Sequence, residues 1–165
     1  MDKRGPDGGR HEGEAGVTAG VPDGFLPYKE PSPFLDRVGP LYEREGDAAG
    51  LVLGLLVLEH HCNRRGFAHG GLLVTLADIA LGKTGERRCD PPVSLLTASL
   101  AFDFVGVVRR GEWVEARCDF HRVGRALAFA NCYLTSDAGV VGRASGVFKV
   151  AAGRNRNGQT EPGRP

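Results

Sequence analysis

Apolar residues are most frequent just after a pair of glycines, Gly70 and Gly71, where they would occupy all sides of a helix. Because no polar face remains at helical spacing, we expect a helix from about Gly71 to Lys83 that is buried on all sides. The apolar residues of this run are Leu72, Leu73, Val74, Leu76, Ile79 and Leu81. Burying its one carboxylate, Asp78, is costly unless that group is paired or used in chemistry.

Strand patterns lie on both sides of this helix. Residues 41–44 and 50–59 predict two strands, and the second is almost continuously apolar, which is typical of a central strand. Residues 94–105 alternate between apolar even positions and polar odd positions, as expected for a strand with one apolar face. Three further strands are predicted at residues 112–121, 126–135 and 140–150.

The order of these elements predicts the fold class. A short helix or turn at residues 31–38, with Ser32 as its N-cap, comes first. Two strands, the buried helix and four consecutive strands joined by hairpin turns follow, one of the turns at residues 122–124. We therefore expect an α+β domain in which one antiparallel sheet curls around one long central helix.

The length of 165 residues predicts a single domain. Residues 1–24 are charged and Gly-rich, without the apolar core of a signal peptide, and we expect them to be disordered. The folded domain should span residues 25–151, and the polar tail at residues 152–165 should also be disordered.

Charge and cysteine content narrow the function classes. The net charge of +1 gives no basic footprint for nucleic acid, and no apolar run is long enough to cross a membrane. The four cysteines show no C-x-x-C spacing, which favours reduced thiols in a cytoplasmic protein. They are Cys62, Cys89, Cys118 and Cys132.

The glycine pair and the carboxylate together indicate chemistry. Backbone N–H groups at the start of a helix, here at Gly70 and Gly71, are free to bind negative charge, which the helix dipole also favours. Asp78, on the same helix, is a candidate general base or nucleophile. One short segment thus offers both an oxyanion site and a reactive carboxylate.

The segment Asn63-x6-Gly70-Gly71-x6-Asp78, with His69 before the glycines, resembles the hotdog-fold acyl-CoA thioesterases, in particular their PaaI-like, phenylacetate-pathway-type branch. The resemblance covers about residues 31–150. It continues in Thr97-x6-Phe104, in Gly111-Glu112, in Gly124-Arg125 and in residues 141–146.

This resemblance implies an acyl-CoA thioesterase that forms a homodimer, often paired into a dimer of dimers, with active sites at the dimer interface. Asn63, His69 and Gly70 would come from one subunit, and Asp78 and Thr97 from the other. The Gly70 N–H would polarise the thioester carbonyl. Coenzyme A is part of the substrate, so no cofactor is expected.

Each assignment has a structural alternative. Gly70 is otherwise needed only for the turn into the helix, and Asp78 is otherwise a structural carboxylate that bonds amides across the interface. Thr97 would orient the water or Asp78, or simply favour a strand. Asn63 would bind the carboxylate or the water, or be a loop residue. His69 would bond near the thioester carbonyl or, as we favour, support the loop.

Coenzyme A carries phosphates, which arginines in loops and turns at the mouth of the site would bind. These arginines are otherwise simply solvated. The candidates are Arg64, Arg65, Arg122 and Arg125. Leu72, Leu73 and Leu76 would line an acyl pocket or belong to the core.

Other functions remain open at this point. His60, His61 and Cys62 are adjacent, but no second ligand pair stands at zinc spacing, so we expect no metal. The alternative to a thioesterase is a non-catalytic acyl-CoA-binding or sensing module, which has no need for Asp78. A hotdog dehydratase or hydratase is a third possibility, but no motif of that kind surrounds His60, His61 or His121.

Overall fold

The computed structural model describes residues 20–46, 50–90 and 93–152. The segments expected to be disordered, 1–24 and 152–165, lie outside the described residues apart from residues 20–24 and residue 152. The elements are β1 (Leu26–Pro27), α1 (Leu35–Val38), β2 (Tyr42–Glu45), β3 (Leu51–Leu56), the 3₁₀ turn η2 (Glu59–His61), α2 (Gly70–Arg87), β4 (Val93–Phe104), β5 (Trp113–Val123), β6 (Leu127–Ser136) and β7 (Gly139–Ala152).

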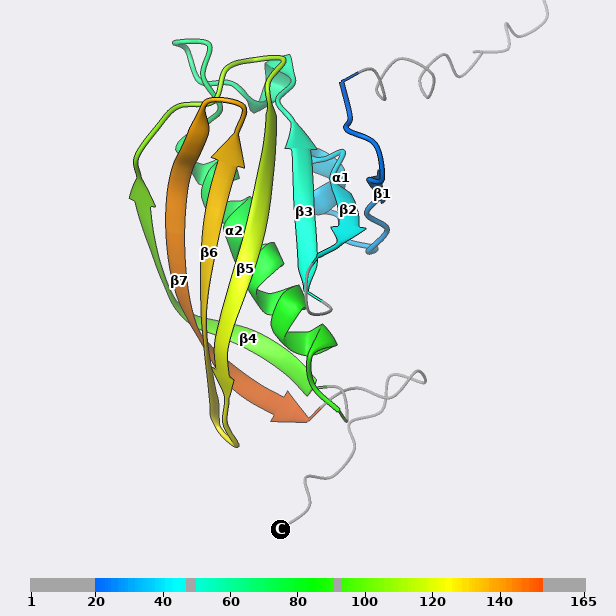
Figure 1. Ribbon diagram of the computed structural model, residues 1–165, viewed down its shortest axis with the longest axis vertical. Coiled ribbons are helices and arrows are strands. Elements are labelled where there is room, and N and C mark those ends of the chain that lie inside the picture. Colours follow the sequence, from blue (N-terminus) through cyan, green and yellow to red (C-terminus); the bar gives the residue numbers. More distant parts are fainter. Residues whose placement is uncertain (1–19, 47–49, 91–92, 153–165) are drawn as a thin grey trace, which may run out of the picture.

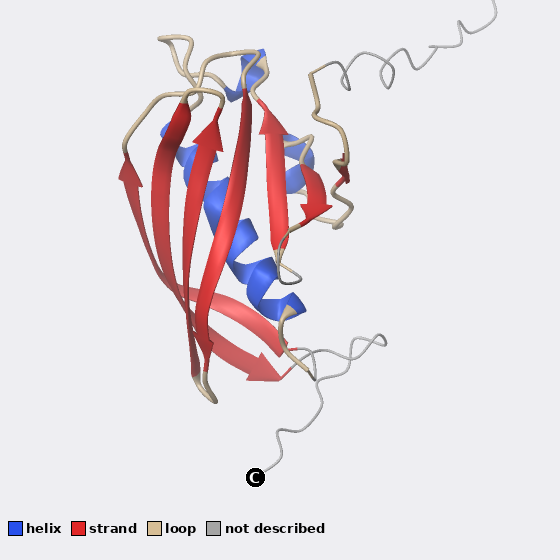
Figure 2. Cartoon of the chain, in the orientation of Figure 1, coloured by secondary structure: helices blue, strands red, loops and turns tan. Residues whose placement is uncertain are grey.

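One sheet curls around the long helix α2 (Figure 1, Figure 2). The sheet has seven strands in the order β1-β2-β3-β5-β6-β7-β4, and every neighbouring pair is antiparallel. Helix α2 contacts all of the strands from β3 to β7. The predicted α+β architecture is therefore confirmed.

The pairing of β4 differs from the expected series of hairpins. β4 pairs with β7 and forms an edge of the sheet, while β5 pairs with β3 in the middle. The turn at residues 107–111 therefore joins two strands that are not neighbours. β4 runs back along α2: the Leu95 N–H donates to Glu86 near the end of the helix, and the Phe104 ring lies against Gly70 at its start.

Strand β3 is apolar along its whole length because both of its faces are covered. Leu53 and Leu55 are fully buried in the core around α2. On the other face, Val52 packs in a second cluster that includes Trp113. A Cβ built on Gly54 would lie 2.0 Å from the Trp113 ring, so only glycine fits there. The prediction of a central strand is confirmed.

Helix α2 is longer than expected and is not buried on all sides. It begins at Gly70 and ends at Arg87, about one turn beyond the predicted end. The residues that face the core include Leu73, Leu76 and Leu81. The open stripe on the other side consists of Gly71, Thr75, Asp78 and Gly82, which are half-buried or exposed because the sheet of one chain covers only part of the helix. Within the described part of the chain, no helix has the length and apolarity needed to cross a membrane.

The alternation in residues 94–105 does not produce a buried face. Leu96 is 57% exposed and Phe104 is 56% exposed, while Leu100 and Phe102 are half-buried. The reason is the edge position of β4, together with a bulge between Thr97 and Ser99 that shifts the register. An edge strand that exposes apolar side chains is a surface on which another chain can pair.

Two predicted boundaries shift for local reasons. The first helix begins at Leu35 after a turn at residues 33–34, and its N-cap is Phe34, so the prediction of Ser32 as the N-cap is wrong. The Ser32 hydroxyl accepts the Leu35 N–H at 3.4 Å instead. The turn expected at residues 122–124 is shorter, because β5 continues through Val123 after a bulge between Phe120 and Arg122.

Candidate active site

The structure brings together two of the predicted site residues, Asp78 and Thr97. Asp78 lies on the open stripe of α2, and Thr97 lies on β4 where the strand bulges. The Thr97 hydroxyl donates a hydrogen bond of 2.8 Å to Oδ1 of Asp78. A hydroxyl held in this way fixes the orientation of the carboxylate, which is the first requirement of a positioned base or nucleophile.

The expectation that Asp78 is enclosed within an apolar helix is wrong for a single chain. The residue is half-buried, because the open stripe of α2 faces away from the core. Within the described residues, Thr97 is the only hydrogen-bond partner of this carboxylate. The remaining lone pairs of Asp78 are therefore available to water or to a group outside this chain.

The start of α2 offers one free backbone N–H, whereas the sequence predicted two, at Gly70 and Gly71. The side chain of His69 is the N-cap, and its Nδ1 accepts the Gly71 N–H at 3.0 Å. The expectation of a free Gly71 N–H is therefore wrong, because a histidine caps the helix here. Within the described residues no group accepts the Gly70 N–H, so this donor is left for a ligand at the positive end of the helix dipole.

Gly70 also has a steric role. A Cβ built at this position would lie 3.1 Å from the ring of Phe104 on β4, which is tighter than ordinary van der Waals contact. Glycine thus allows β4 to pass close to the start of α2. Phe104 was not predicted from the sequence to touch this site, because the contact depends on how β4 runs back along the helix.

Asn63 shapes the loop that leads to this helix. Its side-chain oxygen accepts the Arg65 N–H at 2.8 Å, and its backbone N–H donates to Phe67. Gly66 completes the turn with a φ of 77°, a conformation that favours glycine. The side-chain oxygen of Asn63 is therefore engaged within its own loop, while its amide group keeps donors to offer.

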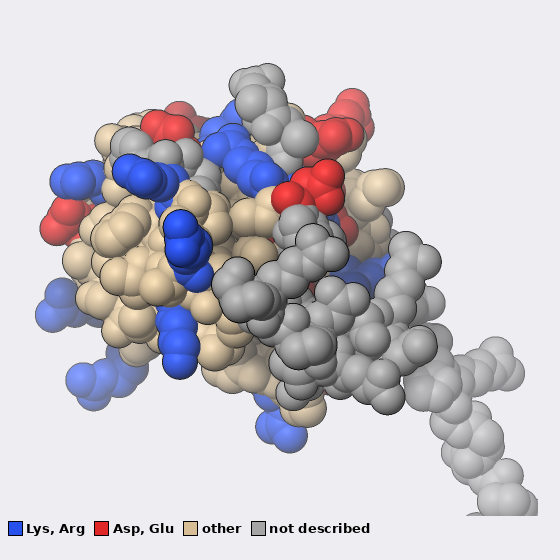
Figure 3. Space-filling model, turned by 90° about the horizontal axis from the view of Figure 1, so that it is seen from below, with Lys and Arg blue, Asp and Glu red and all other residues tan. Residues whose placement is uncertain are grey.

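The four candidate phosphate-binding arginines do not lie together in one chain. Arg64 and Arg65 are exposed in the loop before α2. Arg122 and Arg125 are exposed at the β5–β6 connection, at the opposite end of the sheet. Arg122 belongs to β5 and not to a turn. The view from that end shows the Lys and Arg side chains of the described residues at several separate places on the surface (Figure 3).

The two adjacent histidines contact the backbone. The N–H of Leu58 donates to Nδ1 of His61, so the proton of His61 lies on Nε2, 3.3 Å from the carbonyl oxygen of Gly39. Nε2 of His60 lies 3.2 Å from the same oxygen. Burial and, secondarily, the neighbouring His60 lower the pKa of His61. The Cys62 thiol donates to the Leu58 carbonyl. These side chains therefore hold the end of α1 against η2.

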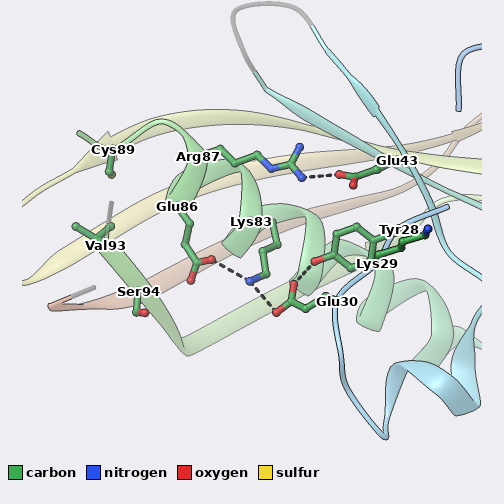
Figure 4. A pocket seen from close by; sticks show the side chains of 10 residues that line it. All are labelled: Tyr28, Lys29, Glu30, Glu43, Lys83, Glu86, Arg87, Cys89, Val93 and Ser94. Atoms are coloured by element: carbon green, nitrogen blue, oxygen red, sulfur yellow. Dashed lines mark hydrogen bonds and ion pairs between the residues drawn. The ribbon is translucent and has the colours of Figure 1, made fainter. Parts of the chain in front are cut away.

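A cavity of about 520 Å³ at the other end of α2 is lined by ion pairs (Figure 4). Lys83 bonds Glu30 at 2.8 Å and Glu86 at 3.0 Å, and Arg87 pairs with Glu43. Although burial opposes both shifts, these bonds lower the pKa of Glu30 and raise that of Lys83. Acids and bases here neutralise one another, which favours a structural role for this network.

Comparison with known proteins agrees with this geometry. The model of the thioesterase superfamily matches residues 65–150, more than half of the chain. A Pseudomonas aeruginosa protein named "Putative esterase PA0474" is 44% identical over 130 residues, which cover 79% of this chain and 97% of that protein.

Solved structures share the fold. A mutant of the phenylacetic acid degradation protein PaaI from Thermus thermophilus is 25% identical, with a TM-score of 0.63 over 72% of this chain and 98% of that one. The protein smu.793 from Streptococcus mutans UA159, solved bound to acetyl CoA, is 20% identical, with a TM-score of 0.59 over 64% of this chain and 83% of that one.

The chain therefore belongs to the thioesterase superfamily. It has the hotdog fold of the PaaI-like thioesterases, and it is a hydrolase that acts on thioesters.

Proposed function

We propose that the protein is an acyl-CoA thioesterase that hydrolyses an acyl-CoA to the free acid and coenzyme A. The observation that carries this proposal is the carboxylate of Asp78, held by Thr97 at 2.8 Å and open on the side away from the core. The acetyl-CoA bound to the Streptococcus mutans protein of similar fold supports coenzyme A as the carrier. The reaction needs only water besides the thioester.

In the proposed reaction Asp78 acts in one of two ways. As a general base it takes a proton from water, whose oxygen attacks the carbonyl carbon. As a nucleophile it attacks that carbon itself and forms an anhydride that water then hydrolyses. In both routes the C–S bond breaks and the sulfur leaves as a thiolate, which takes up a proton. A backbone N–H at the carbonyl oxygen stabilises the negative charge that develops there.

The proposed active site spans two subunits. Gly70 and Asp78 of one chain are eight residues apart on α2, which corresponds to about 12 Å along the helix axis. This separation is too large for both to contact the same thioester carbonyl. We infer that the Gly70 N–H of one subunit faces Asp78 of the other. The exposed apolar edge of β4 and the open stripe of α2 support such a dimer.

The residues around Gly70 have supporting roles in this proposal. His69 fixes the first turn of α2 by accepting the Gly71 N–H, which leaves the Gly70 N–H as the donor. The amide group of Asn63 donates to the attacking water or to Asp78 of the partner subunit. The exposed Arg64 and Arg65 of one subunit, and Arg122 and Arg125 of the other, are candidates for the phosphates of coenzyme A.

We also propose that two dimers pair. The outer face of β6 exposes three large side chains, Leu127 (43% exposed), Phe129 (44%) and Tyr133 (47%), with the half-buried Asn131 between the last two. A stripe rich in exposed large side chains on the solvent side of a sheet is typical of a protein contact surface. This stripe lies on the opposite face of the sheet from α2, so it would leave the proposed active sites open.

The test is the release of free thiol from acyl-CoA substrates by the purified protein and by its Asp78→Asn variant. We expect hydrolysis by the wild type and a loss of at least about a hundredfold in kcat in the variant, with the oligomer intact by light scattering. Full activity of the variant would refute the assigned role of Asp78. Binding of acyl-CoA by the wild type without thiol release would favour a non-catalytic binding module.

A further inference from the structure

A second cavity lies beside the start of α2, between α1, η2 and α2. Its volume is about 370 Å³, near the lower end of the range for small-molecule sites. His69, Gly71 and Thr75 line it on the α2 side. His69 and Gly71 flank the Gly70 N–H. The acyl chain of a thioester whose carbonyl oxygen accepts this N–H can therefore reach the cavity.

The walls of this α1–α2 cavity combine apolar and basic side chains. Phe34, Val38 and Leu72 supply apolar surface. All of its ionisable lining residues are basic: Arg37, His60, His61 and His69. No Asp or Glu lines the cavity among the residues that the structure describes. Such walls suit a short carbon chain that ends in a negative group.

Arg37 is the group best able to meet that charge. It makes no ion pair within the described part of the chain, whereas Glu59 of η2 pairs with Arg110 at 3.4 Å. The side chain of Arg37 is exposed, and the backbone of α1 that carries it is held at its end by the contacts of His60 and His61 with the Gly39 carbonyl. His61 uses both ring nitrogens in these contacts, which leaves the guanidinium of Arg37 as the permanent charge of the cavity.

We propose that the α1–α2 cavity binds the acyl chain and selects short acyl groups that end in a carboxylate, which pairs with Arg37. This inference rests on the proposed function, because it assumes that the thioester carbonyl binds at Gly70. It assigns Arg37 as a specificity-determining residue of the enzyme and a dicarboxylic acyl-CoA as its substrate class.

Glutaryl-CoA and pentanoyl-CoA test this assignment, because their acyl chains have the same five carbons and differ in the terminal carboxylate. We expect the wild type to hydrolyse glutaryl-CoA with a kcat/KM at least about tenfold higher. Arg37→Met should lower kcat/KM for glutaryl-CoA by about tenfold to a hundredfold and leave pentanoyl-CoA within about twofold. Arg37→Lys should retain part of the preference.

Arg88→Met is the matched control. Arg88 is exposed at the other end of α2 and, like Arg37, makes no ion pair within the described residues, so its loss should leave both substrates unaffected. Equal hydrolysis of the two substrates by the wild type would overturn the proposal. An equal loss on both in Arg37→Met would also overturn it, because that result would place the guanidinium on a phosphate of coenzyme A.

Two further measurements separate this inference from the proposed function. Thioesters of N-acetylcysteamine lack the phosphates, and the preference for the glutaryl over the pentanoyl compound should persist with them and disappear in Arg37→Met.

Binding of both acyl-CoAs to Asp78→Asn, measured by calorimetry, requires no hydrolysis. Tighter binding of glutaryl-CoA would support the cavity assignment even if the wild type released no thiol, which would refute only the catalytic proposal. Equal binding would overturn the cavity assignment.

Discussion

Gly70→Pro removes the proposed oxyanion donor at little expected cost to the fold. Gly70 is the first residue of α2, the helical position at which proline is most favoured. His69 precedes it in an extended conformation, with φ −63° and ψ 134°, as a residue before proline requires. Within the described residues the Gly70 N–H has no acceptor, so the substitution breaks no internal hydrogen bond.

The expected loss is large, because the donor acts on charge that develops in the transition state. Removal of one oxyanion donor typically lowers kcat by about 10²–10³, or about 2.7–4 kcal/mol. The steric effect is controlled by Gly70→Ala, which keeps the N–H and also places a Cβ about 3.1 Å from the Phe104 ring. That ring is 56% exposed and can shift, so we expect the alanine variant to retain kcat within about fivefold.

Steady-state thiol release gives kcat and KM for both variants, and circular dichroism with thermal unfolding verifies the fold. We expect the proline variant to lose kcat with little change in KM. If Gly70→Pro and Gly70→Ala have the same kcat while both remain folded, the Gly70 N–H does not stabilise the transition state, and the reasoning fails.

Three further predictions follow from single contacts. Thr97→Val removes the hydroxyl that donates to Asp78 at 2.8 Å, and thiol-release assays should show a kcat about tenfold lower. Gly54→Ala places a Cβ 2.0 Å from the Trp113 ring, and urea unfolding should show a free energy of unfolding lower by about 1–3 kcal/mol or more. Burial lowers the pKa of His61, so the stability that His61 contributes is present above the unfolded pKa of 6.5 and is lost as the pH falls through the folded pKa. Unfolding curves measured between pH 8 and pH 5 should show this decline.

Each of these has a control and an opposing result. Thr97→Ser keeps the hydroxyl and should retain most of kcat, and an unchanged kcat in Thr97→Val would contradict a positioning role. Gly82→Ala, where a Cβ has no contact closer than 3.8 Å within the chain, should not lower the free energy of unfolding, because alanine favours a helix interior more than glycine does, and an equal loss there would contradict the steric argument. The decline toward low pH should be weaker in His61→Gln, and an identical decline would assign the effect to other groups.

The sequence predicted where the helix and strands lie along the chain better than it predicted which strands are neighbours in the sheet. Continuous apolarity located β3 in the middle of the sheet, since both of its faces are covered. Alternation in β4 identified a strand, but alternation does not state which strand pairs with it or whether its apolar face is covered. The edge position of β4, with Leu96 and Phe104 exposed, is a long-range property that no local pattern carries.

The site was predictable where residues lie on one element and unpredictable where separate elements meet. The glycine pair and Asp78 were found because they share α2. The capping of Gly71 by His69 was not, because histidine is not among the usual N-cap residues. The α1–α2 cavity was also not predicted, since Arg37 and His69 line it together only because the fold brings α1 beside the start of α2.

The central claim is that each active site combines Asp78 of one subunit with Gly70 of the other. The most direct measurement mixes the inactive variants Asp78→Asn and Gly70→Pro, lets their subunits exchange, and records thiol release. A mixed dimer has one site with both groups intact, so random pairing in an equal mixture should restore about a quarter of wild-type activity. If the mixture stays inactive although mass spectrometry detects mixed dimers, both groups act within one chain, and the account is contradicted.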